Sequence, residues 1–507
     1  MDVSSSMAAF PGYLTPVDLI RLKLTIDGEL NTSAQIKNLI IADTRSQAKQ
    51  DIQTGINYYR GENDIRNREI TYWDGAQQKI DNSKANNKVA NPFMKLLVDQ
   101  KVSYIVGKPI TYTCEDKKLE SLLNEQLGDW FGDILTQWVQ GACNKGIEFI
   151  HVYIDEDGEL DYAIIPAEQV IPVYDSQFQK KIMYLIRYYV MEVQDENTGV
   201  FQQRYKVEWW TKDKVEFFME TSNGYFIPDD TVYPNPRFHW VSFNTITPSD
   251  VEGNSWGRVP FIELPNNDYR RSDLYSIKAL IDIYDMAISD WANNLQDIQE
   301  AVWKLVNYSG TDLKTFLSDL KTFKAIKLDS DGDAEPIKVE IPYESRSQFL
   351  KVVEKNIYEL GQGVNMGDEN LGTASGTALK YRYGGLDLKA HVLIRKLKYS
   401  LKYFMWFVIK YINMKNNTNF DPNDVEFTIN TSVIVNELER VQELQLSLPM
   451  LSKETILANH PLVDNVYKEL QKIKDGQFDI PNNVGLGRDN LDNTQMNTKV
   501  NPKGEGN

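Results

Sequence analysis

The stretch SDLYSIKALIDIYDMAISDWANNLQDIQE, residues 272–300, decides the fold. Its apolar residues recur at alternating gaps of three and four: Leu274, Ile277, Ile281, Tyr284, Ile288, Trp291, Leu295 and Ile298. That spacing predicts one long helix with an apolar seam. Apart from Lys278, the charged residues are acidic: Asp273, Asp282, Asp285, Asp290, Asp297 and Glu300. We therefore expect one apolar and one acidic face.

A second, longer helix is predicted at 376–415, and it carries the opposite charge. Its apolar seam includes Leu379, Tyr383, Leu386, Ala390, Leu393, Leu397, Leu401, Phe404, Val408 and Tyr411. Asp387 is the only acidic residue of this segment. Its basic residues are Lys380, Arg382, Lys389, Arg395, Lys396, Lys398, Lys402, Lys410 and Lys415. Gly384 and Gly385 interrupt the pattern, and each costs about 1 kcal/mol relative to alanine. We expect a kink or close packing at this pair.

The rest of the chain mixes helices and strands. Helical spacing recurs at 345–360, and Asn91-Pro92 is typical of a helix start, with the stop near Gly107. A further helical region, 119–138, ends near Gly146. Alternating residues predict strands in the middle third, at 149–154, 160–165, 182–193, 203–210 and 214–219. The predicted fold class is therefore α+β, in several structural units.

Composition excludes some function classes. The 507 residues include 55 Lys plus Arg and 72 Asp plus Glu, a formal net charge of −17. An acidic surface repels phosphates, so we expect no tight grip on DNA. The first twelve residues lack a signal-peptide layout, and the apolar run 403–409 is far shorter than the roughly 20 residues of a membrane span. We expect a soluble protein, intracellular when made, without membrane contact.

The motifs of common enzymes are missing. The sequence has no Walker A motif, dinucleotide fingerprint, His-Glu-x-x-His or nucleophile elbow. The run 329–333 superficially resembles a calcium loop, but its glycine is misplaced and a hairpin turn is favoured. Cys143 and His151 could serve as nucleophile and base, but no third partner is indicated. We predict no catalytic residue, metal or cofactor.

Three segments together resemble a known family. The first is NNKVANPF, 86–93, continuing through LVDQKVSY, 97–104, to GKP, 107–109. The second is GRVPFI, 257–262, followed by Asn266-Asn267, SDL at 272–274 and LID at 280–282. The third is ASGTALKY, 374–381. In this order they resemble the SPP1-type (Gp6-like) portal proteins of tailed phages of Gram-positive bacteria.

The resemblance implies a division of the chain. In chain order the expected parts are an N-terminal segment, 1–55; the first part of a wing, 56–270; stem helix 1, 271–300; a small α/β clip, 301–342; stem helix 2, 343–362; a tunnel loop, 363–375; the long kinked wing helix, 376–425; a helical crown, 426–480; and a disordered tail, 481–507.

The resemblance also implies a function and partners. Such proteins form a ring, here expected to have twelve subunits, around a channel for double-stranded DNA at one capsid vertex. The chain would be made in the host cytoplasm and end in the virion. Expected partners are the terminase large subunit, the major capsid and scaffolding proteins, and a head-completion or adaptor protein. A non-portal structural ring or adaptor, or a nuclease, would be the alternatives.

Candidate residues follow from this reading. The DNA-channel candidates are Asp368, Glu369, Asn365, Asn370, Asp282, Asp285, Asp290, Asp297 and Glu300. The candidates for terminase or adaptor docking, in the clip, are Thr311, Asp312, Lys314, Asp329, Asp331 and Asp333. The opposite charges of helices 272–300 and 376–415 could be matched within one subunit or between two.

Overall fold

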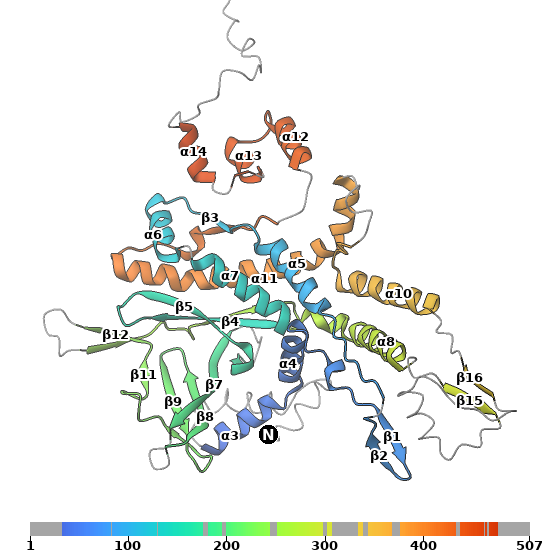
Figure 1. Ribbon diagram of the computed structural model, residues 1–507. Helices are drawn as coiled ribbons and strands as arrows, with labels where there is room; N and C mark the ends of the chain where they lie inside the picture. The colour runs from blue at the N-terminus through green and yellow to red at the C-terminus, as the bar shows by residue number, and fades with distance from the viewer. Residues whose placement is uncertain are drawn as a thin grey trace, which may run out of the picture. The chain divides into compact units, whose positions relative to one another are not determined.

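The computed structural model describes residues 33–82, 84–128, 130–175, 181–194, 199–243, 251–297, 302–306, 333–337, 343–367, 376–431, 437–460, 462–463 and 466–474. The predicted disordered tail lies outside them, as do most of the expected clip and part of the expected tunnel loop. Contacts divide the chain into two units, 1–434 and 435–507. The fold is a mixture of helices and antiparallel sheets, as predicted (Figure 1).

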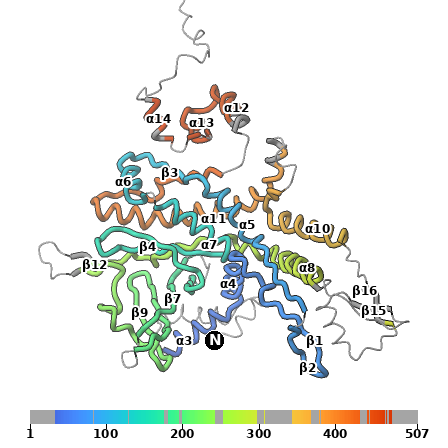
Figure 2. The backbone as a smooth tube through the Cα atoms, viewed as in Figure 1, coloured from blue at the N-terminus to red at the C-terminus, as the bar shows by residue number. Residues whose placement is uncertain are grey.

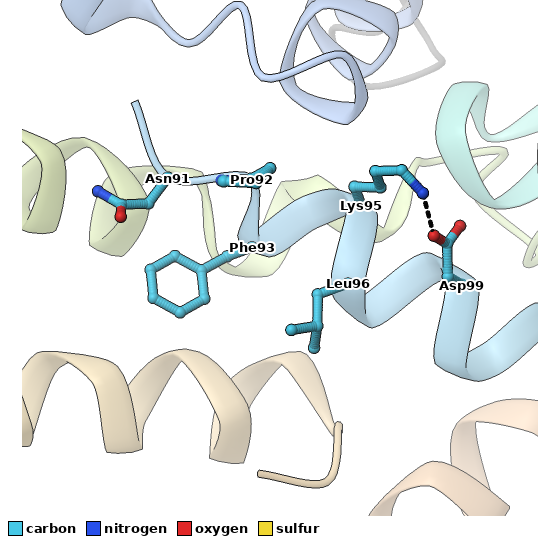
Figure 3. Close-up of a pocket in the computed structure, with 6 residues that line it drawn as sticks. All are labelled: Asn91, Pro92, Phe93, Lys95, Leu96 and Asp99. Atoms are coloured by element: carbon cyan, nitrogen blue, oxygen red, sulfur yellow. Dashed lines mark hydrogen bonds and ion pairs between the residues drawn. The ribbon is translucent and has the colours of Figure 1, made fainter. Parts of the chain in front are cut away.

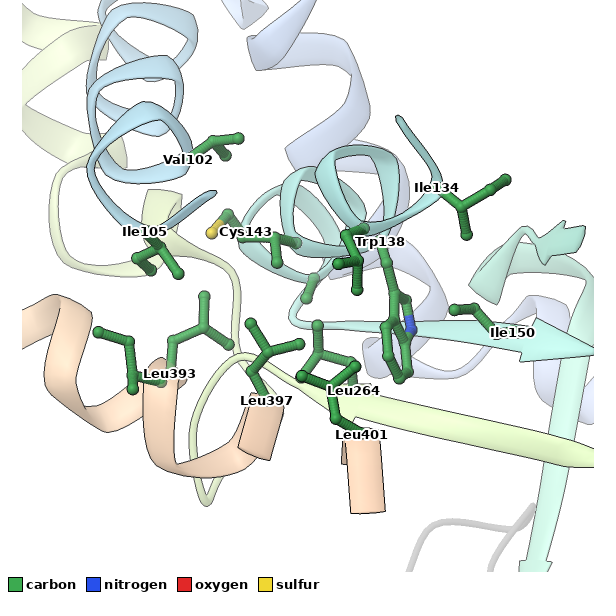
Figure 4. Packing of buried hydrophobic residues seen from close by; sticks show 14 of the residues in the cluster. Val102, Ile105, Ile134, Trp138, Cys143, Ile150, Leu264, Leu393, Leu397 and Leu401 are labelled. Carbon is green, nitrogen blue, oxygen red and sulfur yellow. The ribbon is translucent and has the colours of Figure 1, made fainter. Parts of the chain in front are cut away.

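Five helices of the first unit surround its largest core: α4 (Gln47–Tyr59), α5 (Phe93–Val106), α6 (Lys117–Leu127), α7 (Trp130–Lys145) and α11 (Gly376–Asn416). In Figure 4, Leu393, Leu397 and Leu401 of α11 lie below Trp138 and Cys143 of α7. All five are essentially inaccessible to solvent. The seam predicted for the long basic helix is therefore its buried face.

Local chain signals set the helix ends. The region predicted as one helix at 119–138 is divided, because Gly128 ends α6 with a positive φ of 57°. Gly146, at φ 88°, ends α7 as expected, and an added Cβ there would lie 2.2 Å from the carbonyl oxygen of Arg270. The start of α5 differs slightly from the prediction, because Pro92 rather than Asn91 is its N-cap.

A three-stranded antiparallel sheet lies against these helices. Its order is β14 (Phe261–Pro265), β4 (Ile147–Ile154), β5 (Leu160–Ile165). The predicted hairpin 149–165 is confirmed, with Ile150 opposite Ile164. As the central strand, β4 is buried on both faces over its first six residues, which include the polar Glu148 and His151.

The second large sheet has the order β10-β9-β8-β7-β6, and β11 also pairs with β9. Its strands are β6 (Val170–Tyr174), β7 (Ile182–Gln194), β8 (Phe201–Trp210), β9 (Lys214–Glu220), β10 (Phe226–Pro228) and β11 (Arg237–Phe238). One cluster of buried residues joins it to α3 (Ser33–Thr44), and another joins it to α4 and to strands β4 and β14. The strands predicted at 182–193, 203–210 and 214–219 are therefore confirmed.

The remaining strands form two-stranded antiparallel pairs: β1 (Thr71–Asp74) with β2 (Gln77–Ile80), β12 (Trp240–Phe243) with β13 (Val251–Asn254), β15 (Val302–Val306) with β16 (Asp333–Ile337), and β17 (Glu426–Thr428) with β3 (Thr111–Thr113). The described residues of the first unit also include four short 3-10 helices: η1 (Asp64–Asn67), η2 (Ala167–Gln169), η3 (Asp273–Ser276) and η4 (Pro422–Asp424). The second unit contains α12 (Glu437–Ser447), α13 (Lys453–Asn459) and α14 (Val466–Lys474).

Two helices correspond to the expected stem. They are α8 (Lys278–Asp297), preceded by η3, and α10 (Tyr343–Gly361), and they pack on one another. Phe93, at the start of α5, contacts a tyrosine of each, with ring centroids 5.0 Å from Tyr284 and 6.2 Å from Tyr358. Ile281 of α8 and Val353 and Ile357 of α10 are themselves members of the largest buried cluster, so the stem candidates belong to the main core.

The long helix α11 is hydrogen-bonded from Gly376 to Asn416. Its short N-terminal part runs at a steep angle to the remainder, as the tube in Figure 2 shows. Neither glycine of the predicted kink is required by crowding: an added Cβ at Gly384 would meet no atom within 4 Å, and one at Gly385 would lie 3.7 Å from Gln362. Close packing therefore does not explain the glycine pair.

Candidate functional site

The buried face of α8 changes from apolar to polar along the helix. Leu274 and Ile277, just before α8, and Ile281 within it are buried as the seam predicts, but Leu295 is 56% exposed. Three polar residues four apart are buried instead: Asp285, Ser289 and Asn293. The sequence does not predict this, because polar residues at helical spacing are typical of a solvent-facing surface.

An extended segment explains the burial. Main-chain N–H groups of alternate residues, Asn87, Val89 and Asn91, donate to Asn293 Oδ1 at 2.6 Å, Ser289 Oγ at 3.0 Å and Asp285 Oδ1 at 3.0 Å, respectively. Four helical residues rise about 6 Å, and two extended residues span about 6.6 Å, so the two repeats match. We call these three contacts the polar ladder. It gives the segment NNKVANP a structural role.

Asp285 does not face solvent in the subunit. Its Oδ1 also accepts from Asn91 Nδ2 at 2.7 Å, and its Oδ2 accepts from Asn63 Nδ2 at 2.6 Å. Burial raises the pKa of this carboxyl group, while the donors of Asn63 and Asn91 oppose that rise. With an exposed fraction of 0%, Asp285 cannot be the channel-facing carboxylate that the sequence suggested.

Asp282 and Asp290 of α8 are partly exposed and paired. Lys278 lies 2.8 Å from Asp282 Oδ2, and the Tyr58 hydroxyl donates to the same carboxylate. Arg68 lies 2.7 Å from Asp290. The acidic face of α8 is thus partly neutralised within the subunit, by cations from its own first turn and from the segment after α4.

The other candidates are placed only in part. Asp297 is the last residue of α8, and Asp333 begins β16 opposite Val306. Asn365 is half-buried, and its Oδ1 accepts from the N–H of Gly367 at 2.9 Å. The remaining candidates lie outside the described residues: Glu300, Thr311, Asp312, Lys314, Asp329, Asp331, Asp368, Glu369 and Asn370.

The start of the expected tunnel loop is fixed to α5. Gln100 Nε2 donates to the carbonyl oxygen of Val364 at 2.7 Å, and the N–H of Val364 donates to Gln100 Oε1 at 3.0 Å. Added Cβ atoms at Gly361 and Gly363 would lie 2.7 and 2.0 Å from the buried side chain of Leu97. Glycine is therefore required where the chain leaves α10.

A buried ion cluster joins the same elements. Asp273 of η3 lies 3.2 Å from both Lys101 of α5 and Lys389 of α11. Lys389 also donates to the carbonyl oxygen of Gly361 at 2.9 Å, which ties α11 to the end of α10. Burial alone would raise the pKa of Asp273, but the two ammonium groups outweigh it and hold this pKa at about 2. Sequence reasoning missed the cluster because its members lie far apart in the chain.

No feature of the described residues suggests catalysis. Burial raises the pKa of Cys143 to about 12 and lowers that of His151 to about 3, so neither is poised as nucleophile or base. Within the described ranges, no three His, Cys, Asp or Glu residues gather where they could hold a metal ion. No helix there has both the length and the apolar character to cross a membrane.

Two pockets adjoin these elements. One, of about 260 Å³, lies at the start of α5, where Phe93 and Leu96 point into it and Lys95 pairs with Asp99 beside it (Figure 3). The other, of about 630 Å³, is lined by residues of α10 and α11 and includes Asn365. Neither pocket is lined by a histidine, cysteine or serine of the described residues.

Comparisons with known proteins agree with this picture. The family model described as phage portal protein, SPP1 Gp6-like, matches residues 39–479. The portal protein of Bacillus phage SPP1 is 35% identical over 427 residues, covering 83% of this chain and 82% of that protein. The portal protein of Clostridium phage phiCD119 is 31% identical over 460 residues, covering 87% of this chain and 94% of the relative.

Solved structures give a weaker likeness. A chain from the neck of an empty gene transfer agent particle covers 72% of this chain at 13% identity, with 88% of its own length matched and a TM-score of 0.37. A chain from the virion of the native particle is similar, at 12% identity, with 72% and 88% covered and a TM-score of 0.36.

The assignment of this chain to a family therefore rests on the sequence matches, which cover most of the chain and most of each relative. The chain belongs to the SPP1 Gp6-like family of phage portal proteins, structural proteins of the portal vertex of the virion that act in genome packaging and are not enzymes.

Proposed function

We propose that twelve copies of this chain form a ring whose bore is bounded by α8 and α10. The portal family implies a ring at the capsid vertex. The division proposed for the subunit is that expected from the sequence: wing, two stem helices, clip, tunnel loop, long wing helix and crown. Double-stranded DNA would pass through the bore during packaging and ejection.

The observation that supports this proposal best is the second apolar face of each stem helix. On α8, Ile283 and Met286 are 39% and 47% exposed, and on α10, Phe349 and Val352 are 48% and 56% exposed. Each pair is three residues apart and so lies on one side of its helix. Since α8 and α10 already pack on one another, these faces would be covered by a neighbouring copy.

The negative net charge of the chain favours DNA that slides through the bore over DNA that binds tightly to its wall. Twelve copies carry 12 × −17 = −204 formal charges. An acidic bore within such a ring would repel phosphates and keep DNA mobile. Asp282 and Asp290 remain candidates for its wall, with Asp368 and Glu369 of the tunnel loop. The clip would dock the terminase large subunit during packaging and a head-completion or adaptor protein afterwards, while major capsid and scaffolding proteins would meet the outside of the ring.

Charge reversal in the loop tests this proposal. We expect particles built with Asp368→Lys plus Glu369→Lys to contain normal rings but several-fold less packaged DNA. The matched control is Glu156→Lys plus Asp157→Lys, which changes net charge equally in the exposed turn after β4. Normal DNA yields in the loop variant would remove the loop from the mechanism, and equal losses in both variants would point to net charge alone.

A further inference from the structure

The hairpin of β1 and β2 extends away from the other elements of its unit (Figure 1). All eight of its strand residues are exposed. The loop between the strands is Gly75-Ala76, where Gly75 has the positive φ, 62°, that a tight turn needs. An isolated two-stranded hairpin is marginally stable in water at best, so this one needs a surface to rest on.

The two faces of the hairpin differ. Trp73 pairs with Gln78 and Thr71 with Ile80, so Trp73 and Ile80 share one face, and they are 71% and 51% exposed. On the other face Asp74 forms an ion pair with Lys79 at 2.5 Å. Tryptophan is among the residue types that most often dominate the energetics of a protein interface. Here it shares its face with Ile80 and with Thr71 and Gln78, which are hydrogen-bonded to one another.

The base of the hairpin is fixed rather than hinged. Before β1, Arg68 pairs with Asp290 of α8. After β2, the polar ladder binds the chain along the same helix, and Asn87 Nδ2 also donates to Gln296 at 2.9 Å. Both ends of the arm are therefore held by a helix that the proposed ring places beside a neighbouring copy.

Charge favours another copy of this chain as the occupant. The segment 66–88 contains Arg66, Arg68, Lys79, Lys84 and Lys88 against Glu69, Asp74 and Asp81, a formal +5 − 3 = +2 on a chain of −17. The excess lies at the base of the hairpin, in Arg66, Lys84 and Lys88, because the strands carry only the paired Asp74 and Lys79. A basic base is complementary to an acidic surface, and in a ring every subunit has an acidic neighbour of its own kind. In a closed head-to-tail ring each subunit offers one patch and receives a different one.

We propose that the β1–β2 hairpin is an assembly arm whose Trp73 face docks on the adjacent subunit. This inference rests on the proposed ring. It predicts that assembly depends on Trp73 although the fold of the single subunit does not, because the side chain is mostly exposed.

The first test compares assembly of the full-length chain by mass photometry over a range of concentrations. For Trp73→Ala, the concentration giving half-maximal ring formation should rise at least about tenfold, as for an interface hot spot. The control is Tyr225→Ala, which removes another exposed aromatic side chain, before β10, and should assemble normally. Rings forming at the wild-type concentration in Trp73→Ala would overturn the inference.

The second test identifies the chain that the Trp73 face contacts. Rings are assembled from mixed ¹⁴N- and ¹⁵N-labelled subunits carrying p-benzoylphenylalanine at position 73, irradiated, and analysed by peptide mass spectrometry. We expect cross-linked peptides of mixed isotope composition. Links within one chain only, or, in whole particles, only to DNA or a different protein, would contradict docking between copies. Failure of the wild-type chain to form rings would instead count against the proposed function itself.

Discussion

The side chain of Gln100 pairs with the main chain of Val364 in the manner of a neighbouring β-strand, through bonds of 2.7 and 3.0 Å to its C=O and N–H. Val364 is itself buried, so neither main-chain group has an easy alternative in water. The pairing joins α5, in the first third of the chain, to the residues where α10 becomes the expected tunnel loop. Gln100 is therefore a positioning residue for that loop.

Gln100→Leu should release this anchor. The substitution keeps the approximate size of the side chain but removes both hydrogen bonds, which leaves two buried polar groups unsatisfied at a cost of about 2 kcal/mol. We expect hydrogen exchange at the Val364 amide to accelerate at least about tenfold. Gln126→Leu, which removes the bond from Gln126 to the carbonyl oxygen of Leu160, should leave that amide unchanged. Unaltered exchange at Val364 in Gln100→Leu would refute the anchor.

Asp285 and Asp290, on the same helix, should respond differently to alanine. Asp285→Ala removes the acceptor of three N–H donors in a buried site, so we expect a loss of about 3 kcal/mol in the free energy of unfolding. Asp290→Ala breaks a partly exposed ion pair and should cost less than about 1 kcal/mol. Urea denaturation of both variants measures this, and similar small losses would show that the polar ladder is not structural.

The buried ion cluster should make stability depend on acid. The folded-state pKa of Asp273, about 2, lies below its ordinary value of 3.8, so folding favours the ionised form. Its contribution, about 2 kcal/mol, is fully present above about pH 4 and disappears as the pH falls toward 2. Asp273→Asn should flatten this part of the stability–pH curve and destabilise the chain at neutral pH, since two lysines lose their counterion.

The matched control for the cluster is Asp268→Asn. Asp268 pairs with Lys396 at the surface, and its variant should keep both the acid dependence and nearly all of the neutral-pH stability. If the free energy of unfolding of Asp273→Asn fell below pH 4 as steeply as that of the wild type, this account of the cluster would be contradicted.

The glycine pair of α11 should be replaceable without a clash. Gly384→Ala plus Gly385→Ala adds two Cβ atoms that meet no neighbour closer than 3.7 Å, and each gains about 1 kcal/mol in helix propensity. We expect the double variant to be more stable to urea by about 1–2 kcal/mol. If the double variant is more stable but packages less DNA, the glycines serve bending of the helix during packaging. If the double variant is less stable to urea, the folded subunit itself needs glycine at the bend.

Sequence periodicity predicted much of the fold, and its errors have a common physical cause. Leu393, Leu397 and Leu401 are buried as the heptad of the long helix predicts, because an apolar stripe must be covered. On α8 the seam residues Tyr284 and Trp291 also pack on their neighbours, but periodicity did not predict the burial of Asp285, Ser289 and Asn293. That burial is possible because the extended segment 87–91 supplies N–H donors to this polar stripe.

The sequence predicted which helices carry the candidate site, but not which of their acidic residues are exposed. Acidic residues on α8 appeared equivalent in the sequence, yet Asp285 is buried and Asp290 is not. The contacts that separate them come from residues about 200 positions earlier, which local spacing cannot reveal. Likewise Lys101 reads as an ordinary lysine until Asp273 and Asn266 are placed around it, with Nζ 2.7 Å from Asn266 Oδ1.

Averaged electron images of the purified chain test the central claim most directly. The account predicts rings with an open centre and a mass near 12 × 58.4 ≈ 701 kDa. A chain that stays a single subunit under every assembly condition, or particles that are solid along their axis, would contradict it.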